Sequence, residues 1–171
     1  DFIAEVVSAV RVVEAVIIPL VGTAGVEVGT ERSWNRCEEA GLPRMFFVNK
    51  MDRENADFYR TLDQIQTQFG RKCVAFQVPL GAEQSFEGVV DLLNPPDDVP
   101  QEVADRVREG RERLVEAVAE ADDDLATRFL EGEDISHADL IEATRKAVVA
   151  ADLVPVLVGS ATMNLGVEEL L

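Results

Sequence analysis

The sequence has 171 residues, 47% of them hydrophobic and 29% charged, which provides enough apolar surface for a core and argues against wholesale disorder. The formal net charge of -17 argues against a nucleic-acid-binding face on this chain, because phosphate contacts need clustered Lys and Arg. The two cysteines and one histidine supply neither a disulfide framework nor a metal-ligand set, and the longest apolar run is too short to cross a membrane. We therefore expect a cytoplasmic protein with reduced thiols at Cys37 and Cys73 and no membrane partner.

The first part of the chain alternates helical and strand patterns. Thr30 is expected to cap one of the helices, and Gly41 to end it. Helices are predicted over residues 3–14, 30–40 and 56–69, and buried strands over Ala15–Val21 and Met45–Val48. This alternation indicates a doubly wound parallel sheet.

The pattern changes after Gly70. Strands are predicted over Cys73–Val78 and Phe86–Leu93, and helices over residues 102–120, 122–130 and 136–150. A last buried strand, Val154–Val158, then precedes a helix expected near Gly166. The order is sheet, insertion, sheet. We therefore predict one domain from residues 1–70 and 151–171, interrupted by an acidic insert over residues 71–150.

The strongest local signal is Asn49-Lys50-Met51-Asp52, directly after a predicted strand. In open α/β sheets, ligands bind at the carboxyl ends of the strands. Asp52 could accept both donors of a guanine edge, the ring N–H and the exocyclic amine, whereas adenine places a bare ring nitrogen there. Asn49 can bridge the base and neighbouring loops, and the stem of Lys50 can lie over the base. Read alone, the same four residues also fit a plain polar turn.

A second signal follows the last predicted strand. Ser160 could hold the Asp52 carboxylate, and the small Ala161 would let a backbone N–H approach the guanine carbonyl oxygen. Ser-Ala alone carries almost no information. Paired with Asn-Lys-x-Asp on a preceding parallel strand, it predicts the two-part base reader of GTPases.

Longer stretches then resemble elongation factor G, a family of translational GTPases. The resemblance keeps the family's order along essentially the whole chain. It is carried by Phe47–Arg53, Ala56–Phe58, Gly81–Glu83, Phe86–Leu92, Gly132–Asp134, Val156–Ala161 and Gly166-Val167. It implies the carboxyl half of a GTPase domain, a partial P-loop-NTPase-type parallel sheet with an inserted α+β subdomain. By the same resemblance Asn49, Lys50, Asp52, Ser160 and Ala161 form the guanine site.

The resemblance also implies cofactors and partners. GTP or GDP with Mg²⁺ would bind the whole protein, which would hydrolyse GTP on the ribosome during translocation or recycling. The insert would dock the ribosomal stalk protein, whose basic helix would meet acidic side chains. Candidates at helical spacing are Glu109, Glu112, Glu116 and Glu120. A solvated helix face is the simpler reading of any one of these glutamates.

Several features depart from the family. The chain has no Gly-x-x-x-x-Gly-Lys-Thr phosphate loop, and Asp1-Phe2 would fall just after a second switch whose D-x-x-G turn is not in this sequence. We therefore expect a fragment without the phosphate-binding half, in which no residue is assigned to catalysis or to Mg²⁺ and which is inactive alone.

Two alternatives remain open at this point. The chain could work mainly as an acidic interaction module for the stalk protein. It could also belong to a ribosomal protection or release-factor GTPase, because the link over Asn94–Pro100 is shorter than the family's usual insert.

Overall fold

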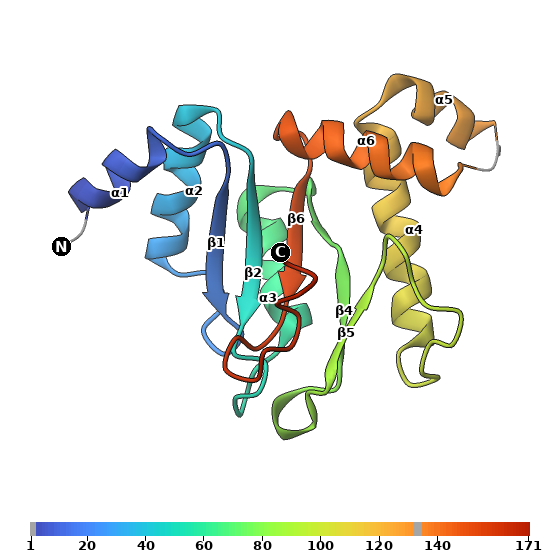
Figure 1. Ribbon diagram of the computed structural model, residues 1–171, viewed down its shortest axis with the longest axis horizontal. Coiled ribbons are helices and arrows are strands. Elements are labelled where there is room, and N and C mark those ends of the chain that lie inside the picture. The colour runs from blue at the N-terminus through green and yellow to red at the C-terminus, as the bar shows by residue number, and fades with distance from the viewer. Residues whose placement is uncertain (1–2, 132–134) are drawn as a thin grey trace.

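The computed structural model describes residues 3–131 and 135–171, an α/β fold built on one parallel sheet (Figure 1). The sheet order is β1-β2-β6-β3, and every neighbouring pair is parallel. The strands are β1 (Val16–Val21), β2 (Arg44–Asn49), β6 (Val154–Val158) and β3 (Cys73–Ala75). The predicted parallel α/β sheet is therefore confirmed. Two stretches named above, Asp1-Phe2 and Gly132–Asp134, lie outside the described residues.

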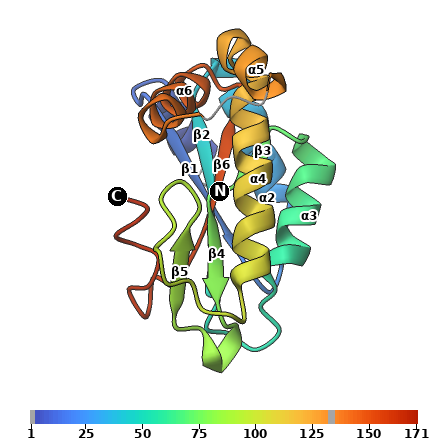
Figure 2. The same cartoon turned by 90° about the vertical axis from the view of Figure 1, so that its right-hand side faces the viewer.

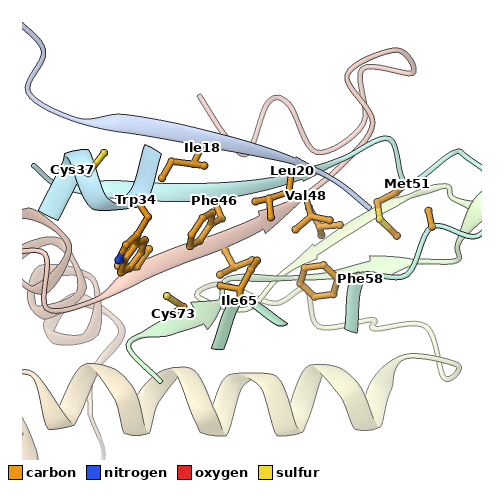
Figure 3. Close-up of a cluster of buried hydrophobic side chains, with 14 of the residues drawn as sticks. Ile18, Leu20, Trp34, Cys37, Phe46, Val48, Met51, Phe58, Ile65 and Cys73 are labelled. Atoms are coloured by element: carbon orange, nitrogen blue, oxygen red, sulfur yellow. The ribbon is translucent and has the colours of Figure 1, made fainter. Parts of the chain in front are cut away.

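Two helices, α2 (Val28–Ala40) and α3 (Phe58–Phe69), share a core with one face of the sheet. Figure 3 shows apolar side chains of the strands meeting those of the helices. At the centre the Trp34 ring stacks on Phe46 at 5.6 Å and on Phe69 at 4.5 Å between ring centroids. Strand and helix are thus joined by aromatic contacts as well as by aliphatic burial.

The edge strand β1 differs from the buried strand that was predicted. It pairs only with β2, and exposure alternates along it, with Ile18 and Leu20 buried and Ile17 49% exposed. The helix before it, α1 (Ile3–Val10), lies against α2 and leaves Val6 and Val7 partly exposed. A continuous apolar run therefore marked a strand correctly but overestimated its burial, because only one face of β1 is covered.

The inserted part forms a second layered unit (Figure 2). It consists of an antiparallel pair, β4 (Gln77–Leu80) with β5 (Gly88–Asp91), and three helices, α4 (Ala104–Glu120), α5 (Asp123–Leu130) and α6 (His137–Val149). A second core joins these elements and includes Leu92, Leu114, Val118 and Leu140. Ser136 caps α6 by accepting the Asp139 N–H at 3.2 Å, as its Ser-x-x-Asp pattern suggests.

The single strand predicted over Cys73–Val78 is two strands. Phe76 donates its N–H to Val156 O at 3.0 Å, the last main-chain bond of this segment to β6. At the next residue a side chain takes the place of a main-chain partner, because Gln77 Oε1 accepts from Val158 N at 3.0 Å. The chain then continues as β4. Since β3 belongs to the main sheet, we propose that the insert begins after Ala75 and not at residue 71.

Further boundaries differ from the sequence prediction, and α1 ends at Val10 and not at residue 14. Helix α2 starts at Val28, so Thr30 lies inside it, although its hydroxyl still accepts from Glu27 N at 3.3 Å. The helix expected near Gly166 is a series of turns in the part of the chain that the structure describes. Gly166 has φ +73°, a left-handed conformation that reverses the chain, and the residues after it complete only one helical turn.

Candidate functional site

Two loops meet where β2 and β6 end. The strands are parallel neighbours with Val48 opposite Val158, so their carboxyl ends lie side by side. Main-chain bonds continue past the ladder: Gly159 N donates to Val48 O at 2.9 Å, and Met51 N donates to Gly159 O at 3.2 Å. The sheet therefore fixes the two predicted parts of the site against each other.

Asn49, the last residue of β2, links the two loops through its side chain. Its Oδ1 accepts from Lys50 N at 2.7 Å and from Ala161 N at 3.0 Å. With this oxygen occupied by two backbone donors, the side-chain amide group is left as the donor that Asn49 can offer. Lys50 has φ +62° and an exposed side chain, so the loop turns sharply at this residue.

Asp52 and Ser160 are in direct contact. The Ser160 hydroxyl donates to Asp52 Oδ1 at 2.6 Å, a short charge-assisted bond, and it accepts from Met163 N at 3.3 Å. Ser160 is fully buried, whereas the Asp52 side chain is 18% exposed. The Ser160 bond lowers the pKa of Asp52, helped by the nearby Arg53 and Lys50, so the carboxylate is ionised at neutral pH.

The turn around Ser160 leaves no space for a side chain at position 159. Ser160 and Leu165 form an antiparallel bridge, with Ser160 N donating to Leu165 O at 2.9 Å. A Cβ on Gly159 would lie 2.4 Å from Leu165 O and 2.8 Å from Phe47 Cζ. Glycine is therefore required at position 159 for close packing and not for an unusual φ.

Two residues outside the predicted set support these loops. Arg60 Nη2 donates to the carbonyls of Gly22 at 3.2 Å, Thr23 at 3.0 Å and Asn55 at 3.4 Å. Glu83, in the turn of the β4–β5 hairpin, bonds Met51 and Asn55, one on either side of Asp52. Glu83 was part of a stretch that carried the family resemblance, but no role was predicted for it. Arg60 had no sequence signal, because its partners are backbone carbonyls, two of them more than 30 residues away along the chain.

The chemistry of the site is that of a fixed carboxylate beside backbone and amide donors. Among residues 3–131 and 135–171, no group of three or more His, Cys, Asp or Glu side chains is placed to hold a metal ion. The carboxylate has one oxygen on Ser160 and is partly open to solvent. It can therefore accept hydrogen bonds from a ligand that presents two adjacent N–H groups.

The four glutamates predicted to dock a partner are all exposed on α4. Glu109, Glu116 and Glu120 line a groove of ≈ 360 Å³ between α3 and α4, whereas Glu112 does not line it. Three arginines, Arg71, Arg106 and Arg113, line the same groove. The acidic helix face is thus divided, and its groove side carries both signs of charge.

In the described part of the chain, no helix has both the length and the apolar character needed to span a membrane.

Comparison with known proteins places this geometry in a family. The crystal structure of a protein from Thermus thermophilus is similar, with a TM-score of 0.89 and 31% sequence identity. The match covers 99% of this chain and 27% of that protein, so the chain spans little more than a quarter of its length. The family model described as the elongation factor Tu GTP binding domain matches residues 1–171. The chain therefore belongs to the family of the elongation factor Tu GTP binding domain, and its predicted place among the translational GTPases is confirmed.

Proposed function

We propose that this chain recognises guanine for a GTP-binding translation factor that resembles elongation factor G. The observation that supports this best is the pair of contacts across the two loops. Ser160 holds Asp52 at 2.6 Å, and Asn49 holds the Ala161 N–H at 3.0 Å. Residues from two segments that are remote in sequence thereby form one preorganised site, which lowers the cost of ordering it when a ligand binds.

The roles follow from what each group can donate or accept. Asp52 accepts from the guanine ring N–H and the exocyclic amine, with Ser160 fixing one carboxylate oxygen. Asn49 offers its amide N–H groups to the acceptors on the other side of the base, and the stem of Lys50 covers the base plane. Adenine would leave Asp52 facing a ring nitrogen lone pair, which is the basis of selectivity.

In the full-length protein this function serves GTP hydrolysis on the ribosome in the cytoplasm. The nucleotide carries Mg²⁺ with its phosphates, and we assign no metal ligand and no catalytic residue within this chain. The α4–α6 helices and the β4–β5 hairpin favour the elongation factor G branch over ribosomal protection or release factors, the alternatives that the sequence left open.

The test is a nucleotide swap in the full-length protein. Asp52→Asn keeps an oxygen for Ser160 but replaces one acceptor with a donor. We expect GDP affinity to fall by roughly 10- to 100-fold, because a bidentate base contact is lost. Affinity for xanthosine diphosphate should rise, since xanthine has a carbonyl where guanine has its amine.

The matched control is Asp63→Asn, which makes the same charge change at an exposed position of α3. It should leave both affinities unchanged. Calorimetric titration with GDP, ADP and xanthosine diphosphate measures all three. If the wild-type protein has equal affinity for ADP and GDP, or if Asp52→Asn leaves the GDP affinity unchanged, Asp52 is not the guanine reader.

A second candidate function is docking of a basic partner such as the ribosomal stalk protein on α4. It is supported by the four exposed glutamates and by the groove beside three of them. Glu112 lies outside this groove and Glu116 lines it, so the two together test both parts of the acidic face. Glu112→Lys with Glu116→Lys should weaken stalk-protein binding and reduce its dependence on salt. Unchanged affinity would exclude α4 as the docking surface.

A further inference from the structure

Glu83 of the β4–β5 hairpin forms hydrogen bonds with the loop that carries Asp52. Its N–H donates to Met51 O at 2.9 Å, and its Oε1 accepts from Asn55 N at 2.7 Å. Both bonds join backbone positions on either side of Asp52. Within the described residues no sheet ladder joins these two segments, so the contact is made by a turn reaching across to a loop.

The first of these bonds fixes the peptide that carries Asp52. The Met51 N–H is held by Gly159 O at 3.2 Å, and the Met51 carbonyl is held by Glu83 N at 2.9 Å. The Met51 side chain is also buried at 1% exposure. Because the Met51 carbonyl belongs to the peptide leading into Asp52, holding it restricts the direction in which the Asp52 side chain leaves the backbone.

The second bond fixes the far side of the loop. Asn55 has φ +65° and Glu83 has φ +56°, left-handed conformations that non-glycine residues adopt at a cost. The Glu83 carboxylate accepts the Asn55 N–H at this contact. Lys50 is a third residue of this kind near the contact, and Asn164 is another in the turn between Ser160 and Leu165.

The hairpin turn presents Glu83 rigidly. The Ser85 hydroxyl donates to Ala82 O at 2.7 Å and accepts from Ala82 N at 3.3 Å. Gly81 has φ +73°, and a Cβ there would lie 1.9 Å from Ser85 O. The turn is therefore closed on itself, and a displacement of the hairpin would move Glu83 with it.

We propose that Glu83 is a positioning residue for guanine recognition, through which the inserted hairpin sets the selectivity of the base-reading loop. The inference rests on the proposed function, because it assigns Glu83 an action on Asp52. Glu83 does not touch the base. It orients the Met51–Asp52 peptide and the turn at Asn55, so its loss broadens the directions open to the Asp52 carboxylate.

The test uses Glu83→Asp and Glu83→Gln in the full-length protein. Asp tolerates the left-handed conformation but is one methylene shorter, so its carboxylate withdraws from Asn55 N. We expect roughly fivefold weaker GDP binding with unchanged ADP binding, about the effect of losing one typical intramolecular hydrogen bond. Gln keeps the acceptor and should bind GDP within about twofold of wild type.

The matched control is Glu87→Asp, the same change at an exposed position of the same hairpin. It should bind GDP and ADP as wild type does. The decisive readout is the ratio of GDP to ADP affinity, together with the melting temperature of each variant. A residue that only stabilises the hairpin would lower the melting temperature without changing this ratio.

Three results would overturn the inference. Glu83→Asp could match Glu87→Asp in GDP affinity, or it could weaken GDP and ADP equally, or Glu83→Gln could lose as much selectivity as Glu83→Asp. These outcomes differ from a failure of the proposed function, which would appear as a wild-type protein without preference for GDP over ADP and would remove both proposals.

Discussion

At the residue scale, the site depends on the hydrogen bond that a buried hydroxyl donates to a partly exposed carboxylate. Ser160 is fully buried and donates to Asp52 at 2.6 Å, and this bond is the largest cause of the lowered pKa of Asp52. A lowered pKa means that the folded protein favours the charged form of the carboxylate. The same bond therefore fixes both the direction and the charge of the proposed base reader.

Replacing Ser160 by Ala should raise the pKa of Asp52 toward its ordinary value. In wild type, the carboxylate remains ionised until the pH falls below the ordinary value of 3.8. Its contribution to folding and to ligand binding is present above that value and is lost as the pH falls through the lowered pKa. In Ser160→Ala the carboxylate should therefore lose its charge at higher pH, and the contribution to folding that comes from the lowered pKa should be smaller. Carbon NMR of the Asp52 carboxyl group during an acid titration measures the shift.

The control is Ser33→Ala, which removes an exposed hydroxyl that donates to Gly29 O at 3.0 Å on α2. It should leave the titration of Asp52 unchanged. An equal Asp52 pKa in wild type and in Ser160→Ala would show that the hydroxyl is not the cause.

Sequence patterns identified the members of the candidate site but not their couplings. Asn49, Asp52 and Ser160 were found because short polar stretches followed predicted strands, a signal that needs no tertiary information. The Asn49 oxygen accepts from two backbone donors because of the register of β2 against β6. No local sequence pattern predicts that register. Arg60 and Glu83 were missed for the same reason, since they act on backbone groups brought close only by folding.

At the element scale, the turn after β6 is limited by packing. Gly159 lies between Leu165 O and the Phe47 ring, and added atoms would meet backbone on one side and a buried ring on the other. The strand, the turn and the site are therefore one packed unit.

We expect Gly159→Ala to lower the free energy of unfolding by about 1–3 kcal/mol, the usual cost of overpacking. Gly29→Ala is the matched control, because a Cβ there meets nothing within 4 Å and the residue lies in α2. That change should be neutral or stabilise by about 0.5 kcal/mol through helix propensity. Urea unfolding of both variants measures the difference, and equal stabilities would contradict the packing argument.

Element types were more predictable than their burial or their ends. Periodicity and apolar runs located the helices and strands up to β6, but the helix expected near Gly166 is a series of turns. Strand β1 is half-exposed, and Cys73–Val78 is divided into two strands. Local sequence does not encode these outcomes. The division occurs at Gln77, whose side chain accepts the Val158 N–H in place of a main-chain carbonyl. This contact depends on the neighbouring strand and not on the local sequence.

At the scale of the whole molecule, two hydrophobic cores share one strand. Cys73 of β3 packs in the sheet core with Trp34, and Val74 packs in the second core with Leu114. Trp34 is the only tryptophan, so its fluorescence reports on the sheet core alone. Because β3 contributes to both cores, we expect the two to unfold in one transition.

Leu114→Ala tests this cooperativity. The side chain is fully buried, so its truncation should cost about 2–5 kcal/mol. Trp34 fluorescence and far-ultraviolet circular dichroism should show the same reduced midpoint. Leu130→Ala, at a side chain that is 85% exposed, should change neither signal. A Trp34 transition that stays at the wild-type midpoint would mean that the cores unfold independently.

The sheet order also decides when the fold can be completed during synthesis. Strand β6 lies between β2 and β3, and Phe46 pairs with Val156, so among the four described strands of this sheet the one that joins β2 to β3 is made last. Until then β2 and β3 each present an unpaired edge, and contacts that are so distant in sequence form slowly. A nascent chain that pauses before Val154 therefore holds the β1–β2 pair and the strand β3 apart, and β6 joins them once it is made.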